Sequence, residues 1–364
     1  MRIIGEYTSA DVFGISIEEG ARDQIKRLLD QDYMVDKKVR IMPDVHQGIG
    51  CVIGYTCNMG EIVIPNIVGV DIGCGMFTVE LGVIDIDLQI LDKYIRKNIP
   101  SGTKTHRDPV IMFNKIKELK CYDNLKNQDR FHRSLGTLGG GNHFIEVGKD
   151  SKDKKYLIIH TGSRNMGKQI ADFYQKLAIE KKGDKYPKDL CYLEGKDKEE
   201  YLFDMNIAQD YAKLNRETIG KIILKGISNN NLEEFKHFHT IHNYIDPKDN
   251  ITRKGAISAY ENEIVLIPLN MRDGSLLGKG KGNNDWNFSA PHGAGRLFSR
   301  KIAKSEGSMT EFRKAMEGIY STSVHEKTLD ESPFAYKNIE EIVNNIGETV
   351  EILDRIIPIY NFKS

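Results

Sequence analysis

Short apolar runs rich in valine and isoleucine recur along this 364-residue chain, and glycine-rich or polar loops follow most of them. Runs of this length and composition are typical of buried strands. The sequence therefore predicts strands at VRIM from Val39, IVGV from Ile67, MFTVEL from Met76, YLIIH from Tyr156 and EIVLIP from Glu263.

Helical periodicity is clear in three other segments, around Lys168 to Glu180, from about Leu202 to Leu224, and from Asn338 to about Asp354. In the last segment an apolar stripe recurs at three- and four-residue steps, which predicts one buried helix face: Ile339, Ile342, Val343, Ile346 and Val350. Strands and helices do not alternate regularly, and no GxGxxG motif opens a helix after a strand, which argues against a dinucleotide-binding fold. We expect an α+β fold, with mixed β-sheets flanked by helices in a single domain over residues 1–364.

Composition limits the partners and the compartment. The chain has 52 Lys and Arg against 52 Asp and Glu, so no global field draws it to nucleic acid or membrane, and any polyanion must be held by a local patch. No apolar stretch approaches the roughly 18 residues of a membrane span, and the first residues lack the apolar core of a signal peptide. Five scattered cysteines, an odd number, do not suggest a disulfide framework. We expect a cytoplasmic protein in a reducing compartment.

Five histidines stand beside Gly, Asn, Asp or Thr where strands are predicted to end, the places where sites are built: His46, His143, His160, His242 and His292. Taken singly, each such histidine is more often a hydrogen-bonded structural residue than a ligand. Their shared context favours a functional role for the set. The residues alone do not show whether Asp44 or His46 acts as a base or only supports ligands.

Asp71 and Cys74 lie three residues apart in the glycine-rich loop of NIVGVDIGCGMFTVEL, so both side chains can reach one point. A carboxylate and a thiolate suit a borderline divalent metal, although a core cysteine and a turn aspartate explain the pair equally well. With His143, His160 and His242 they form five donors, which suits two metals sharing the thiolate better than one closed tetrahedral site. A dinuclear site favours phosphoryl or nucleotidyl chemistry.

Two glycine-rich segments suggest contacts to a nucleotide. In LGTLGGGNHFIEV the three glycines allow close backbone approach beside Asn142, His143 and Glu146, although a simple glycine turn is the alternative. In SAPHGAGRLFSRKIAK we expect a loop followed by a helix, with His292 before the glycines and with Arg296 and Arg300 one turn apart. Free N–H groups and guanidiniums favour phosphate, and a neutral imidazole beside it can act as nucleophile or as acid and base. A helix-capping segment with solvated arginines is the alternative.

Further basic residues lie close to a candidate ligand or a glycine loop, and together they are candidates for the local anion patch: Arg164, Lys168, Arg216, Arg253 and Lys254. Individually they are ordinary surface charges. The candidate contacts to phosphate are Arg164, Arg216, Arg253, Lys254, Arg296 and Arg300.

The sequence resembles the RtcB family of RNA ligases. The family motifs occur in the same order along almost the whole chain: MPDVHQGIG, GVDIGCG, LGTLGGGNHFIEV, IIHTGSRNMG, IHNYI, RKGA, HGAGRLFSR, SPFAYK and PIYNFK. The resemblance implies an RtcB-like fold and an enzyme that joins an RNA 3′-phosphate or 2′,3′-cyclic phosphate to a 5′-hydroxyl. It also implies GTP, manganese and a guanylylated histidine, in RNA repair or tRNA splicing, with an activating protein partner possible in principle.

Carried over by position, the resemblance makes His292 the nucleophile. It implies that two manganese ions are bound by Asp71, Cys74, His143, His160 and His242. It implies contacts to the guanosine nucleotide from Asn142, His143, Phe144, Ile145, Glu146, His242, Asn243, Pro268, Leu269, Asn270, Met271, Ser275, His292, Gly293, Ala294, Gly295 and Lys363, with Tyr336 near the base.

The sequence departs from the family pattern at three places that concern RNA or guanosine. Gly73 stands where Asn is common, Thr252 stands where His is usual, and PLNM from Pro268 replaces a Gly-Ser type of loop. The chain therefore resembles a shorter, divergent branch. Two alternatives stay open: a metal-dependent RNA phosphoesterase or cyclic-phosphate hydrolase without ligation, and a non-catalytic RNA-binding protein. The second is disfavoured because a binding protein needs no nucleophile.

Overall fold

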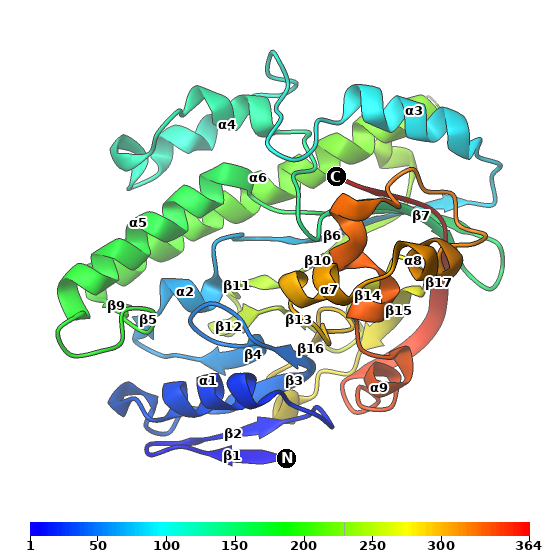
Figure 1. Cartoon of the computed structure of the whole chain (residues 1–364). Helices are drawn as coiled ribbons and strands as arrows, with labels where there is room; N and C mark the ends of the chain where they lie inside the picture. Colours follow the sequence, from blue (N-terminus) through cyan, green and yellow to red (C-terminus); the bar gives the residue numbers. More distant parts are fainter. Residues whose placement is uncertain (229) are drawn as a thin grey trace.

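Two large β-sheets form the framework of the computed structural model, which describes residues 1–228 and 230–364 (Figure 1). The first sheet has six strands in the order β1 (Arg2–Ile4), β2 (Ser9–Val12), β3 (Val39–His46), β4 (Ile53–Asn58), β12 (Ile251–Lys254) and β11 (Asn243–Ile245). Only β2 and β3 pair in parallel among the registered strand pairs of the described residues. With the second sheet and the helices, this arrangement confirms the α+β prediction.

The second sheet has seven strands and is almost closed. Its order is β10 (His237–Ile241), β6 (Gly75–Gly82), β8 (Lys155–Thr161), β7 (Phe144–Lys149), β17 (Val350–Lys363), β15 (Gly274–Gly280) and β14 (Ile264–Asn270). The two outer strands meet, since the Leu266 N–H of β14 donates to Thr240 Oγ1 of β10 at 3.2 Å. The smaller pairs are β13 (Ala256–Ser258) with β16 (Ser289–Pro291), and β5 (Ile62–Val63) with β9 (Leu193–Glu194).

Helices cover the outer faces of the sheets. The long helices α5 (Arg164–Lys182) and α6 (Gly195–Ile227) run side by side, and α6 also packs against α3 (Leu88–Asn98) (Figure 1). The remaining α-helices are α1 (Glu19–Leu29), α2 (Pro65–Val68), α4 (Asp129–Ser134), α7 (Arg300–Glu306), α8 (Met309–Ala315) and α9 (Ile339–Val343). Short 3₁₀ turns η1 to η7 occupy Asp32–Met34, Asn114–Glu118, Tyr122–Asn124, Leu232–Glu234, Asn284–Trp286, Glu326–Glu331 and Pro333–Ala335.

The core beneath α6 fixes the strands that carry the site. Ile219 and Ile223 of α6 are fully buried in one cluster with Phe77 of β6 and Ile159 of β8. Gly220 permits this close approach, because a Cβ there would lie 2.8 Å from the Phe77 ring. The helix therefore holds β6 and β8 in a fixed position, and the candidate site is built at the ends of these strands.

Four of the five predicted strands are confirmed, as β3, β6, β8 and β14. The prediction at Ile67–Val70 is wrong, because α2 occupies Pro65–Val68 and begins with a proline whose fixed φ suits a first helical turn. Ile67 and Val68 are nevertheless buried, so the apolar run indicated burial correctly but not its geometry.

The helices predicted around Lys168 to Glu180 and from Leu202 to Leu224 are confirmed within α5 and α6. The helix predicted from Asn338 to Asp354 is wrong beyond its first turn, since α9 ends at Val343 and β17 begins at Val350. The intervening Asn and Gly residues are poor helix formers. Ile342, Ile346 and Val350 are still buried in one apolar cluster.

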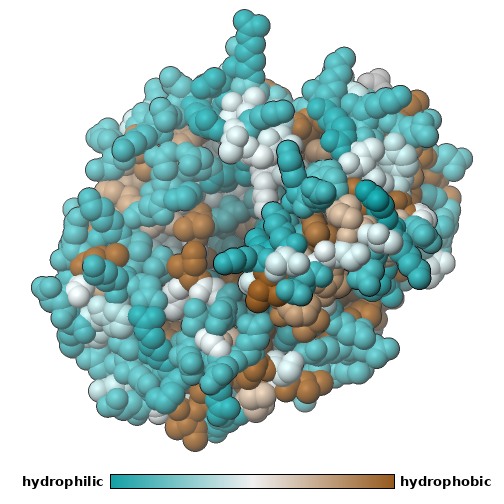
Figure 2. All heavy atoms as spheres, viewed as in Figure 1, coloured by the Kyte–Doolittle hydropathy of each residue, from teal (hydrophilic) through white to brown (hydrophobic). Residues whose placement is uncertain are grey.

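The structure bears on the cysteines and on membrane-spanning helices. The five cysteines are all buried and free of disulfides. No helix in residues 1–228 or 230–364 is long and apolar enough to cross a membrane. The surface seen in Figure 2 is mostly hydrophilic and is hollowed near its middle, with single apolar side chains around the hollow.

Candidate metal centre and adjoining pocket

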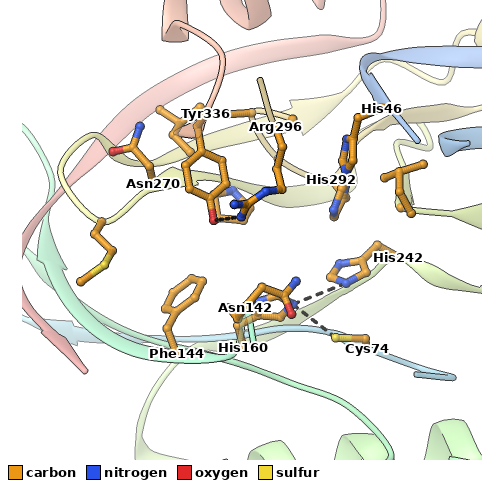
Figure 3. Close-up of a pocket in the computed structure, with 18 of the residues that line it drawn as sticks. His46, Cys74, Asn142, Phe144, His160, His242, Asn270, His292, Arg296 and Tyr336 are labelled. Atoms are coloured by element: carbon orange, nitrogen blue, oxygen red, sulfur yellow. Dashed lines mark hydrogen bonds between the residues drawn. The ribbon is translucent and has the colours of Figure 1, made fainter. Parts of the chain in front are cut away.

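A cavity of about 570 Å³ lies where the two sheets, the HGAG segment and the end of β17 meet. Figure 3 shows two facing walls. Cys74, Asn142, Phe144, His160 and His242 lie on one side, and His46, Asn270, His292, Arg296 and Tyr336 lie on the other. Fifteen of the eighteen predicted nucleotide contacts line this cavity; His143, Ile145 and Ser275 do not. Ile145 and Ser275 are buried behind the wall.

Strand register brings the candidate metal ligands together on the first wall. His160 of β8 is paired with Met76 of β6 on one side and with Phe144 of β7 on the other. Cys74 and His143 immediately precede these two strands, so both approach His160. Gly75 is paired with Ile241, and the His242 N–H donates to the Cys74 carbonyl at 3.0 Å.

The five side chains form two donor groups that share one sulfur. Cys74 with His160 and His242 is one group, and Asp71 with Cys74 and His143 is the other; within each group the donor atoms lie within 4.8 Å of one another. Cys74 Sγ is 3.3 Å from His160 Nε2 and 3.5 Å from His143 Nε2. The structure therefore places the thiol between two potential ion positions.

Backbone carbonyls orient two of the imidazoles. His143 Nδ1 donates to the Leu138 carbonyl at 3.0 Å, and His160 Nδ1 donates to that of Asn142 at 3.2 Å. In the neutral rings these bonds leave the Nε2 lone pairs facing the cluster, an orientation typical of metal-binding histidines. His143 Nε2 lies 2.9 Å from Asp71 Oδ2, close enough for one proton or one metal ion to be held between the two atoms.

Burial sets the protonation of the cluster. It lowers the pKa of His160 and of His242 well below the ordinary value, which keeps both rings neutral and able to bind a cation. It raises the pKa of the Cys74 thiol well above its ordinary value, and the Asp71 carboxylate raises it further. Burial alone would raise the pKa of Asp71, but its hydrogen bond with His143 holds that pKa below the ordinary range.

His292 is fixed on the opposite wall by Asp44. Its Nδ1 is 2.6 Å from Asp44 Oδ2, and its backbone N–H donates to the same oxygen at 3.1 Å. Asp44 is fully buried in β3. Gly295 (φ +75°) packs on the Asp44 backbone, where a Cβ would lie 2.6 Å from the carbonyl oxygen. The arrangement leaves His292 Nε2 for chemistry in the cavity, and the His292 and His242 rings are 4.8 Å apart.

His46 lies beside this pair. Its Nδ1 donates to the Asp44 carbonyl at 2.8 Å, and burial lowers its pKa to about 4. The ring is therefore neutral at pH 7. It contacts the Asp44 backbone and not the carboxylate that holds His292.

A buried carboxylate, Glu331, binds four side chains that line the cavity. Glu331 accepts from Tyr336 Oη at 2.6 Å and pairs with Arg300 at 3.0 Å, with Arg296 at 3.3 Å and with Lys363 Nζ. Burial alone would raise the pKa of Glu331, but Lys363 and Arg300 lower it to about 2. Sequence reasoning missed Glu331; its only signal is its place directly before SPFAYK. Helix α7 begins at Arg300, so Arg296 precedes it in the loop.

Glu146 is buried at the base of the cavity. Its Oε2 accepts from Asn361 Nδ2 at 3.0 Å, whereas Oε1 has no partner within the described residues. Burial raises the pKa of Glu146 to about 8. An unpartnered buried acceptor on a cavity wall is suited to a ligand that brings its own N–H groups.

Four of the basic residues proposed for RNA phosphate are used within the fold. Arg216 is fully buried and donates to the carbonyls of Gly73 at 2.7 Å and Thr161 at 2.9 Å. Arg253 is fully buried between Asp246 and Asp249. Lys254 donates to the carbonyls of Ile49 and Asn66, and Arg164 donates to Thr137 and Gly102. These residues stabilise loops and strands and do not form an open patch, whereas Arg296 and Arg300 line the cavity.

The departures from the family pattern have structural settings. Gly73 has φ +69°, which strains any other residue, and a Cβ there would crowd α6 at 3.0 Å from Gln209 Cα. Thr252 is buried in β12. The PLNM segment ends β14, and all four of its residues line the cavity.

These features define a class of protein: an α+β protein with a candidate dinuclear metal centre and a carboxylate-held histidine in one cavity. Comparison of the sequence with known proteins gives the family. The chain matches the family described as "tRNA-splicing ligase RtcB" over residues 24–121 and 115–364. It is 30% identical to the RNA-splicing ligase RtcB of Escherichia coli K12, over 93% of both chains. It is 29% identical to the tRNA-splicing ligase RtcB of Nanoarchaeum equitans, over 84% of this chain and 83% of that one. The chain belongs to the RtcB family.

Proposed function

We propose that this protein is a GTP- and manganese-dependent RNA ligase that joins a 3′-phosphate or 2′,3′-cyclic phosphate end to a 5′-hydroxyl end through a GMP–His292 intermediate. The observation that carries the proposal is the position of His292, held by a buried carboxylate beside a shared-thiol donor cluster in one cavity. The names of the relatives support RNA splicing or tRNA splicing as the process.

Asp71, Cys74, His143, His160 and His242 would hold two manganese ions. The donor set fits, because a thiol, a carboxylate and three imidazoles present their donor atoms in two groups, each within 4.8 Å. The thiol and imidazoles alone do not single out manganese among divalent ions, so this choice rests on the family resemblance. When bound, the ions supply positive charge against phosphate oxygens.

His292 acts as the nucleotide carrier. Its Nε2 forms a bond to the α-phosphorus of GTP, the bond from that phosphorus to the bridging oxygen breaks, and pyrophosphate leaves. The ring becomes positively charged at this step, and Asp44 at 2.6 Å stabilises the proton on Nδ1. Because Nδ1 keeps its proton in the hydrogen bond with Asp44, His292 leaves as a neutral imidazole when its P–N bond breaks again.

Transfer to RNA regenerates His292. A 3′-phosphate oxygen, formed where needed by hydrolysis of a cyclic phosphate, attacks the phosphorus of the bound GMP, and the P–N bond breaks. The 5′-hydroxyl oxygen then attacks the RNA 3′-phosphorus and loses its proton, and GMP leaves. Arg296 and Arg300, which line the cavity, are placed to reduce the repulsion between these anions.

Glu146 favours guanine over adenine. Guanine carries N1–H and N2–H donors on one edge, and the unpartnered Oε1 of Glu146 can accept from them. Adenine has no pair of donors there. Hydrogen bonds from the base favour the ionised carboxylate and offset the burial that raises its pKa to about 8 in the free protein.

Ligation itself is the direct test of the proposed function. A 3′-phosphorylated RNA and a 5′-hydroxyl RNA incubated with the protein, GTP and manganese are expected to give a joined product on a denaturing gel. ATP in place of GTP is expected to give none. A joined product that forms without any nucleotide would contradict the GMP-dependent route.

Asp44→Asn is expected to slow GMP transfer to the protein by about 10²- to 10⁴-fold, the range seen when the carboxylate behind a catalytic histidine loses its charge. The measurement is the rate at which α-labelled GTP labels the protein. Metal content should stay at the wild-type value, because Asp44 is not among the donor atoms. Labelling at the wild-type rate would show that Asp44 does not support His292.

Glu146→Gln is expected to make stability less dependent on pH. The folded carboxyl, with a pKa of about 8, keeps its proton between pH 4.5 and 8, whereas the unfolded chain has released it. The wild-type protein therefore loses stability as pH rises through this window, and the variant does not. In thermal unfolding without nucleotide, the Tm of the variant minus that of wild type should increase from pH 5 to pH 9. A constant difference in Tm across that range would contradict the buried, protonated state.

A further inference from the structure

An exposed aromatic ring stands at the mouth of the cavity. The chain is buried from Gly293 to Gly295 and is exposed over six consecutive residues, Leu297 to Ile302. Phe298 is 37% exposed and lines the cavity. In the described part of the chain the other exposed aromatic side chains are Tyr7 and Phe203, and neither lines the cavity. Phe298 is therefore positioned to contact a ligand that enters the cavity.

The backbone that carries Phe298 is held on both sides. The Leu297 N–H donates to the Ala335 carbonyl at 2.9 Å, and Arg296 Nε donates to the carbonyl of Phe298 itself at 3.1 Å. On the other side, Ser299 Oγ accepts from the Ile302 N–H and caps α7. The ring is thus presented from a fixed segment, so its exposure does not reflect a loose loop.

Cationic side chains flank the ring. Arg300, Lys301 and Lys304 on α7 are all exposed. Asp330, which pairs with Arg300 and Lys304, is buried, and Glu306 is the exposed carboxylate of α7, so three exposed cations outnumber one exposed anion on this helix. An exposed aromatic ring beside a row of cations is the combination with which proteins bind single-stranded nucleic acid, the ring by stacking on a base and the cations by contacting phosphates.

We propose that Phe298 stacks on a base of the RNA strand whose 3′-phosphate end enters the cavity, at the last or the next-to-last nucleotide. The inference rests on the proposed function and adds a subsite to it. The stacked base could in chemical terms come from RNA or from GTP, since both carry a nucleobase. The position of the ring favours RNA, because Glu146 and Lys363, the groups that suit guanosine, are 2% and 6% exposed, far deeper than Phe298.

The test compares RNA binding by Phe298→Ala, Phe298→Tyr and Leu297→Ala. The probe is a short fluorescent RNA with a 3′-phosphate, and the readout is anisotropy in the presence of manganese. Base stacking on an aromatic ring predicts that Phe298→Ala weakens binding by about 5- to 100-fold. Phe298→Tyr should bind within about twofold of wild type. Leu297→Ala is the matched control, since Leu297 is an exposed apolar neighbour, 45% against 37% for Phe298, that lines a separate cavity.

A second RNA, abasic at its last two nucleotides, isolates the stacking. It is expected to bind wild type and Phe298→Ala equally, because the base that the ring contacts is gone. Thermal unfolding of each variant shows whether it is folded. An equal loss on both RNAs, or binding of the intact RNA at the wild-type level, would overturn the proposal.

The outcome separates this inference from the proposed function. If wild type carries no GMP but still binds RNA more tightly than Phe298→Ala, the stacking site stands and the ligase assignment fails. If Phe298→Ala raises the KM for GTP in protein labelling more than it weakens RNA binding, the ring serves guanosine and the inference fails. If wild type binds no RNA, both fail.

Discussion

His292→Ala is expected to abolish covalent retention of GMP. Wild type incubated with manganese and GTP labelled at the α-phosphate should keep the label after denaturation. The variant should be labelled at least about 10⁴-fold more slowly, because no other group replaces a missing nucleophile. The P–N bond predicts a label that is lost in acid and kept in alkali. The measurement is label retained on the denatured chain, before and after acid treatment.

His237→Ala is the matched control for this experiment. His237 is exposed on β10, and its Nδ1 contacts only the Phe235 carbonyl among the described residues, so the variant should be labelled like wild type. Metal content and thermal unfolding of His292→Ala should be unchanged, since its ring is outside both donor groups. Label retained on His292→Ala would place the nucleotide elsewhere. An unlabelled but folded and metal-loaded wild type would favour a metal-dependent phosphoesterase.

The sequence predicted which residues are buried better than it predicted their geometry. Ile342, Ile346 and Val350 are spaced as on one helix face, and all three are buried in one cluster. They reach it from a short helix, a turn and the start of a strand. Apolar residues that recur every three or four positions over so short a segment indicate burial. The backbone conformation is set by the long-range pairing of β17 with β7 and β15.

The candidate metal ligands could be predicted because their residue types are unusual in glycine-rich loops and at the ends of strands. A cysteine and an aspartate in a glycine-rich loop, and histidines at strand ends, are visible one at a time in the sequence. Their convergence could not be derived, since strand register across β6, β8 and β10 produces it. The residue types suggested the grouping and the family motifs agreed with it, but neither gives the geometry.

The partners of the supporting residues could not be predicted, because they are remote in sequence. Asp44 and His292 are 248 residues apart, and Arg216 reaches Gly73 across 143 residues. A basic residue beside a candidate ligand has the same local sequence signature whether it faces solvent or a buried carbonyl. The sequence therefore predicted Arg216 as a surface charge. In the structure it is buried so completely that burial lowers the pKa of its guanidinium to about 10.

Cys74→Ala is expected to remove bound metal from both positions, because its sulfur belongs to both donor groups. Losing one donor from each group should weaken metal binding by more than about 100-fold, since even changes to residues that only support the ligands cost 10- to 100-fold. GMP transfer to His292 should fall with the metal. Metal per chain after dialysis against a weak chelator is the measurement, with label retention as the second readout.

His143→Ala makes the sharing of the thiolate testable. His143 belongs to the group with Asp71 and not to the group with His160 and His242, so this variant should keep one of two ions where Cys74→Ala keeps none. Cys121→Ala is the control for removing a buried thiol, since Cys121 lies in the apolar core with its backbone N–H bonded to Asp204. Equal metal content in Cys74→Ala and His143→Ala would rule out a bridging sulfur. Normal metal content with normal labelling in Cys74→Ala would remove the dinuclear assignment altogether.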